Sequence, residues 1–169
     1  MKKNKLTANI TTNKSEKVKS TYYIGIFLVA LSTLLLEFTL TRVLSVSLWY
    51  NFAFMIISVA LLGFGISGVL LSVNKKLQTI PADKLLTILS MIYGSSVIIS
   101  FILINKIPFD PFSLFSQSIQ FVYLPVFYIL ITIPFLFAGL IISVILTRFK
   151  KNVSKLYFAD LLGAGLSVF

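Results

Sequence analysis

The sequence predicts an all-α fold, a polytopic transmembrane helical bundle, and three observations support this. First, 57% of the 169 residues are hydrophobic and only 12% are charged, whereas about a quarter of the residues in soluble globular domains are charged. Second, the apolar residues form blocks of about 20 residues or more, the length of a helix that crosses a bilayer core. Third, the basic residues gather in alternate connecting segments. This pattern indicates four complete spans and a truncated fifth.

Four apolar blocks have the length of a membrane span, and a fifth begins near the end of the sequence. We place the four complete spans near residues 22–48, 51–73, 85–104 and 121–147. The fifth starts near residue 156 as LYFADLLGAGLSVF, and no polar residues close it. We therefore expect the chain to be cut within this span. The predicted organisation is a basic tail over residues 1–21 followed by a transmembrane helical domain over residues 22–169.

Positive charge is distributed unevenly between the connecting segments, and this sets the expected orientation. Of the 15 Lys and Arg, six lie in the tail, three in the loop over residues 74–84 and four in the loop over residues 148–155. Only Arg42 and Lys106 lie toward the other side. The positive-inside rule then predicts a multi-pass protein of the cell membrane whose N-terminus is cytoplasmic.

A short amphipathic helix is expected between the third and fourth spans, near residues 111–120. Asp110 is a good helix cap, and Pro111 follows it at the first helical position. Phe112, Phe115 and Ile119 then recur at helical spacing. We interpret this segment as a helix lying in the outer membrane interface, and a lid that gates a ligand is the alternative.

The residue inventory argues against catalysis within these 169 residues. The sequence has no Cys, which excludes disulfides and thiolate metal sites, and no His, the commonest general base. We therefore predict no catalytic residue, no cofactor and no metal site. The net charge of +10 is divided among segments that the spans separate, so it does not indicate a nucleic-acid partner. The expected partner is the lipid bilayer, and the tail either binds anionic lipid or only holds the N-terminus inside.

The stretch LLGFGISGVLL contains Gly63, Gly65 and Gly68 with the spacing G-x-G-x-x-G. In a dinucleotide-binding turn this spacing follows a strand and opens a helix. Here it lies within a continuous apolar run of membrane length, with no strand before it. Small residues allow membrane helices to approach closely. We therefore interpret the glycines as helix-packing residues on two nearly opposite faces of the second span, which predicts a neighbouring helix on each face.

Glu37 is the most informative polar residue, because it lies within the first span in the stretch LLLEFTLTR. A carboxylate near the centre of a membrane helix costs on the order of 2.5–3.5 kcal/mol on insertion scales, which the surrounding apolar residues offset. Ala30, Thr33, Glu37, Thr41 and Ser45 share one stripe of the helix, and we expect this stripe to face the bundle interior. Two hypotheses remain open: a structural polar network, or a path for a proton or substrate.

Arg42 and Asp160 are the other candidate intramembrane polar residues. Arg42 lies five residues after Glu37, about 140° around the helix, so an ion pair between them within one helix is awkward. Arg42 either extends outward to the interface or meets Glu37 or a carbonyl through a neighbouring helix. Asp160 lies near the predicted start of the fifth span, where the helix dipole favours a carboxylate. We interpret it as a helix-start residue.

Two long stretches of the chain match a known family. LLLEFTLTRVLSVSLWYNFAFMIISVALLGFGISGVLLS and LYFADLLGAGLSVF resemble the N-terminal membrane region of membrane-bound spermidine-synthase-like proteins. Asn51 stands where the family is expected to have His, and Ser167 where it is expected to have Gly. The positions that match the family pattern are Glu37, Thr41, Arg42, Ser45, Tyr50, Phe52, Gly63, Gly65, Gly68, Tyr157, Asp160, Leu161 and Gly163.

The resemblance implies a function in which this chain is the membrane part of a larger protein. In that family a multi-helix membrane domain precedes a soluble aminopropyltransferase-like domain, which holds the catalytic and polyamine-binding groups. We therefore expect an integral membrane domain that anchors or complements a cytoplasmic transferase domain and is not an enzyme by itself. The alternatives are the core of a small-solute or proton transporter, and a structural subunit that pairs with another membrane protein.

Overall fold

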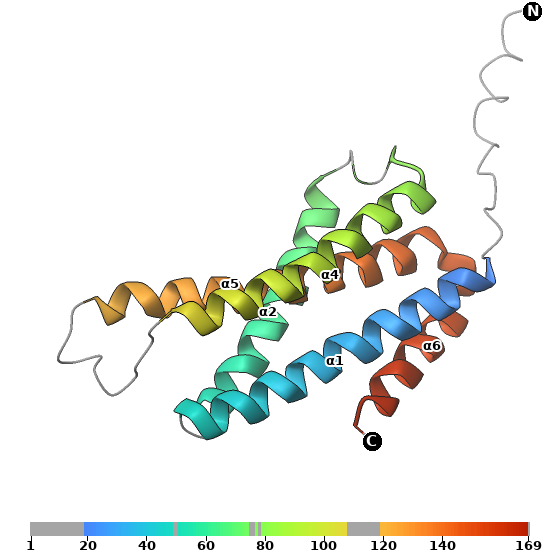
Figure 1. Ribbon diagram of the computed structural model, residues 1–169. Coiled ribbons are helices and arrows are strands. Elements are labelled where there is room, and N and C mark those ends of the chain that lie inside the picture. The colour runs from blue at the N-terminus through green and yellow to red at the C-terminus, as the bar shows by residue number, and fades with distance from the viewer. Residues whose placement is uncertain (1–18, 49–50, 75–76, 78, 108–118, 169) are drawn as a thin grey trace, which may run out of the picture.

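The computed structural model describes residues 19–48, 51–74, 77, 79–107 and 119–168, and within them the fold is all-α with no strand (Figure 1). This confirms the predicted fold class. In chain order the elements are α1 Ser20–Leu48, α2 Asn51–Val73, α4 Ala82–Lys106, α5 Gln120–Arg148, the 3-10 turn η2 Lys150–Asn152, and α6 Val153–Leu166.

Four helices, α1, α2, α4 and α5, are long and apolar enough to cross a membrane. The helix α2 has the bounds that the apolar pattern predicts, while α1, α4, α5 and α6 begin one to three residues earlier than predicted. These extra residues are mainly polar, because a helix continues past the apolar stretch into the interface. Apart from residues 119 and 120, the expected helix near 111–120 lies outside the described residues.

The helix α5 is the centre of the bundle. It packs closely against α2, α4 and α1, while α6 packs along α1 (Figure 1). Two apolar clusters fill the interior. One cluster joins α1, α4, α5 and α6 around Ile26, Ile145 and Leu156, and the other joins α1, α2 and α5 around Ile56 and Phe135. Burying these side chains in close-packed surroundings orients the polar residues described below.

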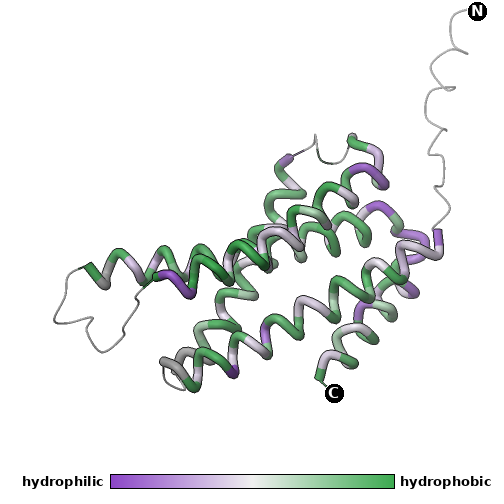
Figure 2. Tube along the Cα trace, in the orientation of Figure 1, coloured by the Kyte–Doolittle hydropathy of each residue, from purple (hydrophilic) through white to green (hydrophobic). Residues whose placement is uncertain are grey.

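Polar residues gather at one end of the bundle (Figure 2). This end, called the basic end below, holds the starts of α1, α4 and α6 and the ends of α2 and α5. The described parts of the three segments in which the sequence concentrates positive charge therefore meet at the same end. Its described cations are Lys19, Lys84, Arg148, Lys150, Lys151 and Lys155.

The contact between α2 and α5 is close because small residues face it. A Cβ at Gly63 would lie 2.8 Å from Phe135 Cβ and 2.9 Å from the Leu136 backbone nitrogen. One turn along α2, the buried Ser67 lies against Gly139 of α5. Two small residues four apart on α2, together with Gly139 on α5, let the two backbones approach. Gly63 is thus a packing residue.

The second predicted face of α2 has no neighbour within the described residues. Gly65 and Gly68 are exposed, and a Cβ at either would meet nothing within 4 Å. Within the described residues, the predicted packing is therefore seen at Gly63 and not at Gly65 or Gly68. The physical reason is that both of α2's partners, α5 and α1, lie on the side that carries Gly63 and the buried Ala60.

Candidate functional site

The polar stripe of α1 changes its environment along the helix. Ala30 and Thr33, nearer the basic end, are buried, whereas Glu37, Thr41 and Ser45 are half-buried. The stripe faces other helices in its first half and reaches a partly open region in its second half. The expectation that the whole stripe faces the interior therefore holds for its first half and only partly for its second.

A cluster of three hydroxyl groups joins α1 to α4 at the middle of the stripe. The Tyr93 hydroxyl of α4 lies 3.1 Å from Ser32 Oγ and 3.2 Å from Thr33 Oγ1. Both α1 hydroxyls donate to the Val29 carbonyl oxygen, at 3.0 and 2.6 Å. Because each serine or threonine hydroxyl has one proton, Tyr93 is the donor in this cluster. Sequence reasoning missed Tyr93, since a tyrosine in an apolar run reads as an apolar or interfacial residue.

A cleft of about 280 Å³ opens beyond this cluster, and we call it the α1–α4 cleft. It is lined by Leu36 and Leu40 of α1, by Ser100 and apolar neighbours of α4, and by Ile131 and Pro134 of α5. Glu37 follows Leu36 and lies about one turn before Leu40. Among the described residues, Glu37 has no hydrogen bond or ion pair. Glu37 is therefore a half-buried carboxylate without a polar partner among the described residues, next in sequence to the cleft residue Leu36.

The wall of the cleft includes Pro134, and a side chain of α4 replaces the backbone hydrogen bond that this proline removes. Pro134 has no backbone N–H, so the carbonyl of Leu130, four residues earlier, loses its helical partner. Ser100 Oγ of α4 donates to that carbonyl oxygen at 2.8 Å. The carbonyl that Pro134 leaves without a helical partner is therefore satisfied by a neighbouring helix, as is usual in membrane helices. Because a proline always frees the carbonyl four residues earlier, the sequence could have identified the Leu130 carbonyl as an acceptor. It could not have identified Ser100 as the donor.

Arg42 is exposed and makes no ion pair with Glu37 in the part of the chain that the structure describes. Of the two alternatives left open for Arg42, outward extension fits this exposure. The structure therefore does not bring the two charged residues of the LLLEFTLTR stretch together.

Asp160 lies deeper in its helix than the sequence suggested. Because α6 begins at Val153, Asp160 ends the second helical turn, beyond the first turn where the dipole acts. Its Oδ1 atom is buried and has no hydrogen-bond partner among the described residues. The interpretation of Asp160 as a helix-start residue is therefore wrong, because the helix starts one turn earlier than the apolar pattern does.

The helix α6 packs along α1 and comes very close to it at Gly163. A Cβ at Gly163 would collide with the carbonyl oxygen of Phe27 and would lie 3.2 Å from the Leu31 backbone nitrogen. Leu156, two turns earlier on α6, is fully buried in the same contact region.

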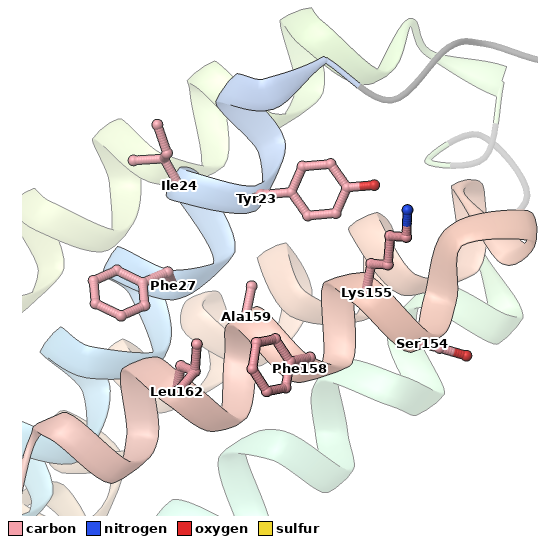
Figure 3. A pocket seen from close by; sticks show the side chains of 8 residues that line it. All are labelled: Tyr23, Ile24, Phe27, Ser154, Lys155, Phe158, Ala159 and Leu162. Atoms are coloured by element: carbon pink, nitrogen blue, oxygen red, sulfur yellow. The ribbon is translucent and has the colours of Figure 1, made fainter.

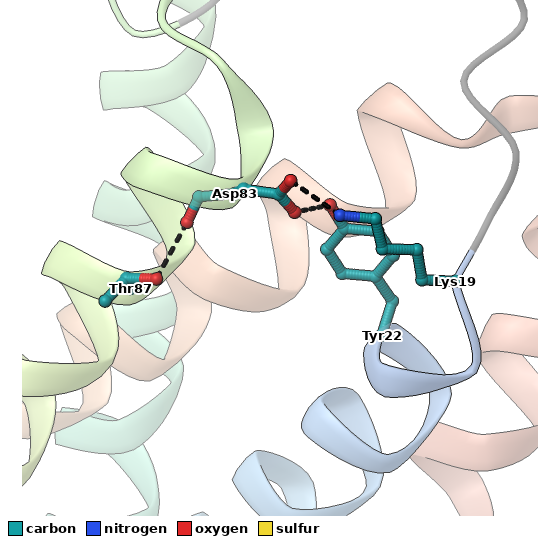
Figure 4. Close-up of polar contacts among 4 residues, drawn as sticks. All are labelled: Lys19, Tyr22, Asp83 and Thr87. Carbon is teal, nitrogen blue, oxygen red and sulfur yellow. Dashed lines mark hydrogen bonds and ion pairs between the residues drawn. The ribbon is translucent and has the colours of Figure 1, made fainter.

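Polar contacts tie the elements of the basic end to one another. Lys19 Nζ donates to Asp83 Oδ2 at 2.8 Å and the Tyr22 hydroxyl donates to Asp83 Oδ1, which joins α1 to α4 (Figure 4). Arg148 of α5 donates to the carbonyl oxygens of Leu77 and Ile80, at 3.1 and 2.5 Å. The loop between α2 and α4 is therefore held against the end of α5.

Among the residues that the structure describes, no three potential metal ligands, whether His, Cys, Asp or Glu, lie close enough together to hold a metal ion. The three described carboxylates, Glu37, Asp83 and Asp160, lie on three different helices. Comparison of the chain with models of protein families, with characterised proteins and with solved structures finds no match.

Proposed function

We propose that this chain is the membrane domain of a spermidine-synthase-like protein, in which it anchors or complements a cytoplasmic transferase domain. The observation that carries the proposal is the contact between α1 and α6. These helices hold parts of the two family-like stretches, and Gly163 of one stretch packs against the backbone of Phe27 and Leu31, just before the other. A tight helix–helix contact gives a physical reason for a small residue at that position.

The proposal includes an orientation, with the basic end in the cytoplasm of a multi-pass cell-membrane protein. The uneven charge favours it, and the structure gathers these cations at one end of the bundle. The sequence has no Cys, so single cysteines can be introduced directly. In intact cells, a membrane-impermeant maleimide should label Asn105→Cys but should label Lys151→Cys only after lysis. Labelling of both in intact cells, or the reverse pattern, contradicts the orientation.

The anchoring role is tested by tagging the N-terminus of the chain at its native locus. We expect the tag to mark a membrane-bound product much larger than 18.9 kDa, or to co-purify with a transferase domain in a one-to-one ratio. The purified material should then transfer an aminopropyl group to a polyamine acceptor. A product of 18.9 kDa without such a partner contradicts the anchoring role.

A second candidate function is transport of a proton or small solute, which the α1–α4 cleft favours. Glu37 follows the cleft residue Leu36 in sequence and has no polar partner among the described residues. If the chain is a transporter core, Glu37→Gln should abolish uptake or proton release in proteoliposomes while the protein remains folded. If the chain is an anchor, the same variant should change only stability or assembly.

A third candidate function is a structural subunit that pairs with another membrane protein. The exposed small residues Gly65 and Gly68 favour it, because they leave room for a helix from another chain. Under this proposal Gly65→Leu should remove a stoichiometric partner from the purified complex. Retention of the partner by Gly65→Leu contradicts a pairing through this face.

A further inference from the structure

The helices α1 and α6 both begin at the basic end, and their outward surfaces enclose a groove of about 580 Å³ (Figure 3). We call it the α1–α6 groove. Its walls are formed by Ile24 and Phe27 on α1 and by Phe158 and Leu162 on α6. This volume lies within the range of small-molecule sites. It therefore has room for an elongated apolar ligand.

The walls of the groove are apolar and open. Ile24 is 58% exposed and Phe158 is 63% exposed, although both lie next to the buried contact between the two helices. The contact at Gly163 fixes the backbones of α1 and α6, so these side chains cannot close over the gap by moving the helices together. The apolar surface is therefore available to a ligand.

The end of the groove toward the basic end is polar and positively charged. The Lys155 ammonium and the Tyr23 hydroxyl lie there, on opposite walls (Figure 3). Lys150 and Lys151, just before α6, are exposed at the same end. None of these three lysines forms an ion pair with a described residue. The positive charge at this end of the groove is thus not neutralised by described residues.

The length of the groove matches part of one membrane leaflet. From Lys155 to Leu162 the helix rises about 10 Å, at roughly 1.5 Å per residue. One leaflet contributes about 15 Å of a hydrocarbon core that is roughly 30 Å thick. A ligand with an anionic head at Lys155 would place its apolar tail along Phe158 and Leu162 inside that leaflet.

We propose that the α1–α6 groove binds an anionic phospholipid, with the phosphate at Lys155 and Tyr23 and an acyl chain along Ile24, Phe27, Phe158 and Leu162. This inference rests on the function proposed above, which places the chain in a membrane. A lipid supplies both features that the groove requires, because its phosphate neutralises the lysines and its acyl chain covers the apolar walls. A covering protein helix would need an acidic residue placed at the same point.

The test uses a single tryptophan and lipids that quench its fluorescence. The native Trp49 is replaced by Phe, and Phe158→Trp places a probe in the groove. The matched control is Val69→Trp on α2, which is 62% exposed and also lies near the basic end. Each variant is reconstituted in phosphatidylcholine that contains a small fraction of acyl-brominated phosphatidylglycerol or, separately, acyl-brominated phosphatidylcholine.

We expect brominated phosphatidylglycerol to quench the groove probe at a mole fraction roughly five-fold lower than brominated phosphatidylcholine does, the factor for one basic residue near the surface. The control probe should show a smaller preference. Lys155→Gln, at an exposed site, should remove most of the preference at the groove. Equal quenching by the two lipids at Phe158→Trp, or a preference that survives Lys155→Gln, overturns the proposal.

The same measurement separates this proposal from membrane placement. If both lipids quench Val69→Trp but neither quenches Phe158→Trp, a protein segment covers the groove and the lipid proposal is wrong, although the chain is in the bilayer. If no lipid quenches either probe, the membrane placement itself is wrong, and the lipid proposal fails with it. Circular dichroism of each variant establishes that it has kept its helix content.

Discussion

The α2–α5 and α1–α4 contacts of this bundle hold their helices together in different ways. Between α2 and α5, Gly63, Ser67 and Gly139 allow the backbones to approach until almost no space remains. Between α1 and α4, the backbones do not approach closely. The Tyr93 hydroxyl bridges this wider gap, and the α1–α4 cleft opens beyond it.

The difference shows that helices of an apolar bundle are held together either by close contact between small residues or by hydrogen bonds between larger polar ones. In lipid, helices gain little from burying apolar surface, so close van der Waals contact and hydrogen bonds hold them together. The α2–α5 contact relies on van der Waals contact, and a single methyl group should disturb it. The α1–α4 contact relies on hydrogen bonds across a gap, so changes of volume should matter less there than the loss of one hydroxyl.

The largest effect is expected from Gly63→Ala. The added Cβ would lie 2.8 Å from Phe135 Cβ and 2.9 Å from the Leu136 nitrogen, and backbone cannot move aside as a flexible side chain can. Overpacking of this kind costs about 1–3 kcal/mol or more. The measurement is the free energy of unfolding in mixed micelles, followed by circular dichroism as SDS is added.

The matched control for this substitution is Gly65→Ala, two residues away on the same helix. Its Cβ would enter open space, and alanine favours a helix over glycine by up to about 1 kcal/mol. We expect no loss of stability at Gly65. Equal destabilisation by Gly63→Ala and Gly65→Ala would contradict a tighter contact at Gly63 than at Gly65.

The second effect concerns the wall of the α1–α4 cleft. Ser100→Ala removes the donor to the Leu130 carbonyl oxygen, which has no backbone partner because of Pro134. An unsatisfied buried acceptor costs about 1–3 kcal/mol, and we expect the lower half of that range. The free energy of unfolding measured as above checks this value.

A double-mutant cycle with Pro134→Ala isolates the cause. This substitution restores the missing backbone N–H, which can then donate to the Leu130 carbonyl, so the hydroxyl of Ser100 becomes redundant. In that background Ser100→Ala should be almost neutral. If Ser100→Ala costs the same with and without the proline, the serine acts through packing and not through the freed carbonyl.

The third effect is smaller and tests the bridge between α1 and α4. Tyr93→Phe removes the donor of the hydroxyl cluster, while Ser32 and Thr33 keep their hydrogen bonds to the Val29 carbonyl. Since no donor is left unsatisfied, we expect a loss of about 0.6–1 kcal/mol, the usual range for hydrogen bonds between membrane helices. A loss above about 2 kcal/mol would mean that the bridge, and not α5, holds α1 in place.

The smallest effect is expected at the basic end, outside both contacts. Lys19 and Asp83 form an ion pair at 2.8 Å, but their side chains are 62% and 63% exposed. Exposed pairs contribute about 0–1 kcal/mol and are screened by salt. Lys19→Gln should therefore lower the free energy of unfolding only slightly at low salt and not measurably at high salt. A larger, salt-independent loss would show that the basic end holds the bundle together.

The fold was largely predictable because an apolar run of about 20 residues or more predicts a helix long enough to cross a membrane. The bounds of α2 follow from the apolar pattern alone, and those of α1, α4 and α5 follow to within three residues. The polar residues were less predictable. Glu37 could be placed on a stripe with Thr33, but the absence of a polar partner for it among the described residues depends on which helices pack beside α1.

The sequence by itself determined the all-α architecture, the four long apolar helices and the uneven distribution of positive charge, because these depend on local composition and helical periodicity. The tertiary structure alone decided that Gly63 is in close contact and Gly65 is not, and that Tyr93 bridges two helices. It also decided that Asp160 lies two turns into α6 with a buried oxygen. The physical reason is that a helix repeats every 3.6 residues whatever lies beside it, so periodicity defines its faces but not its neighbours.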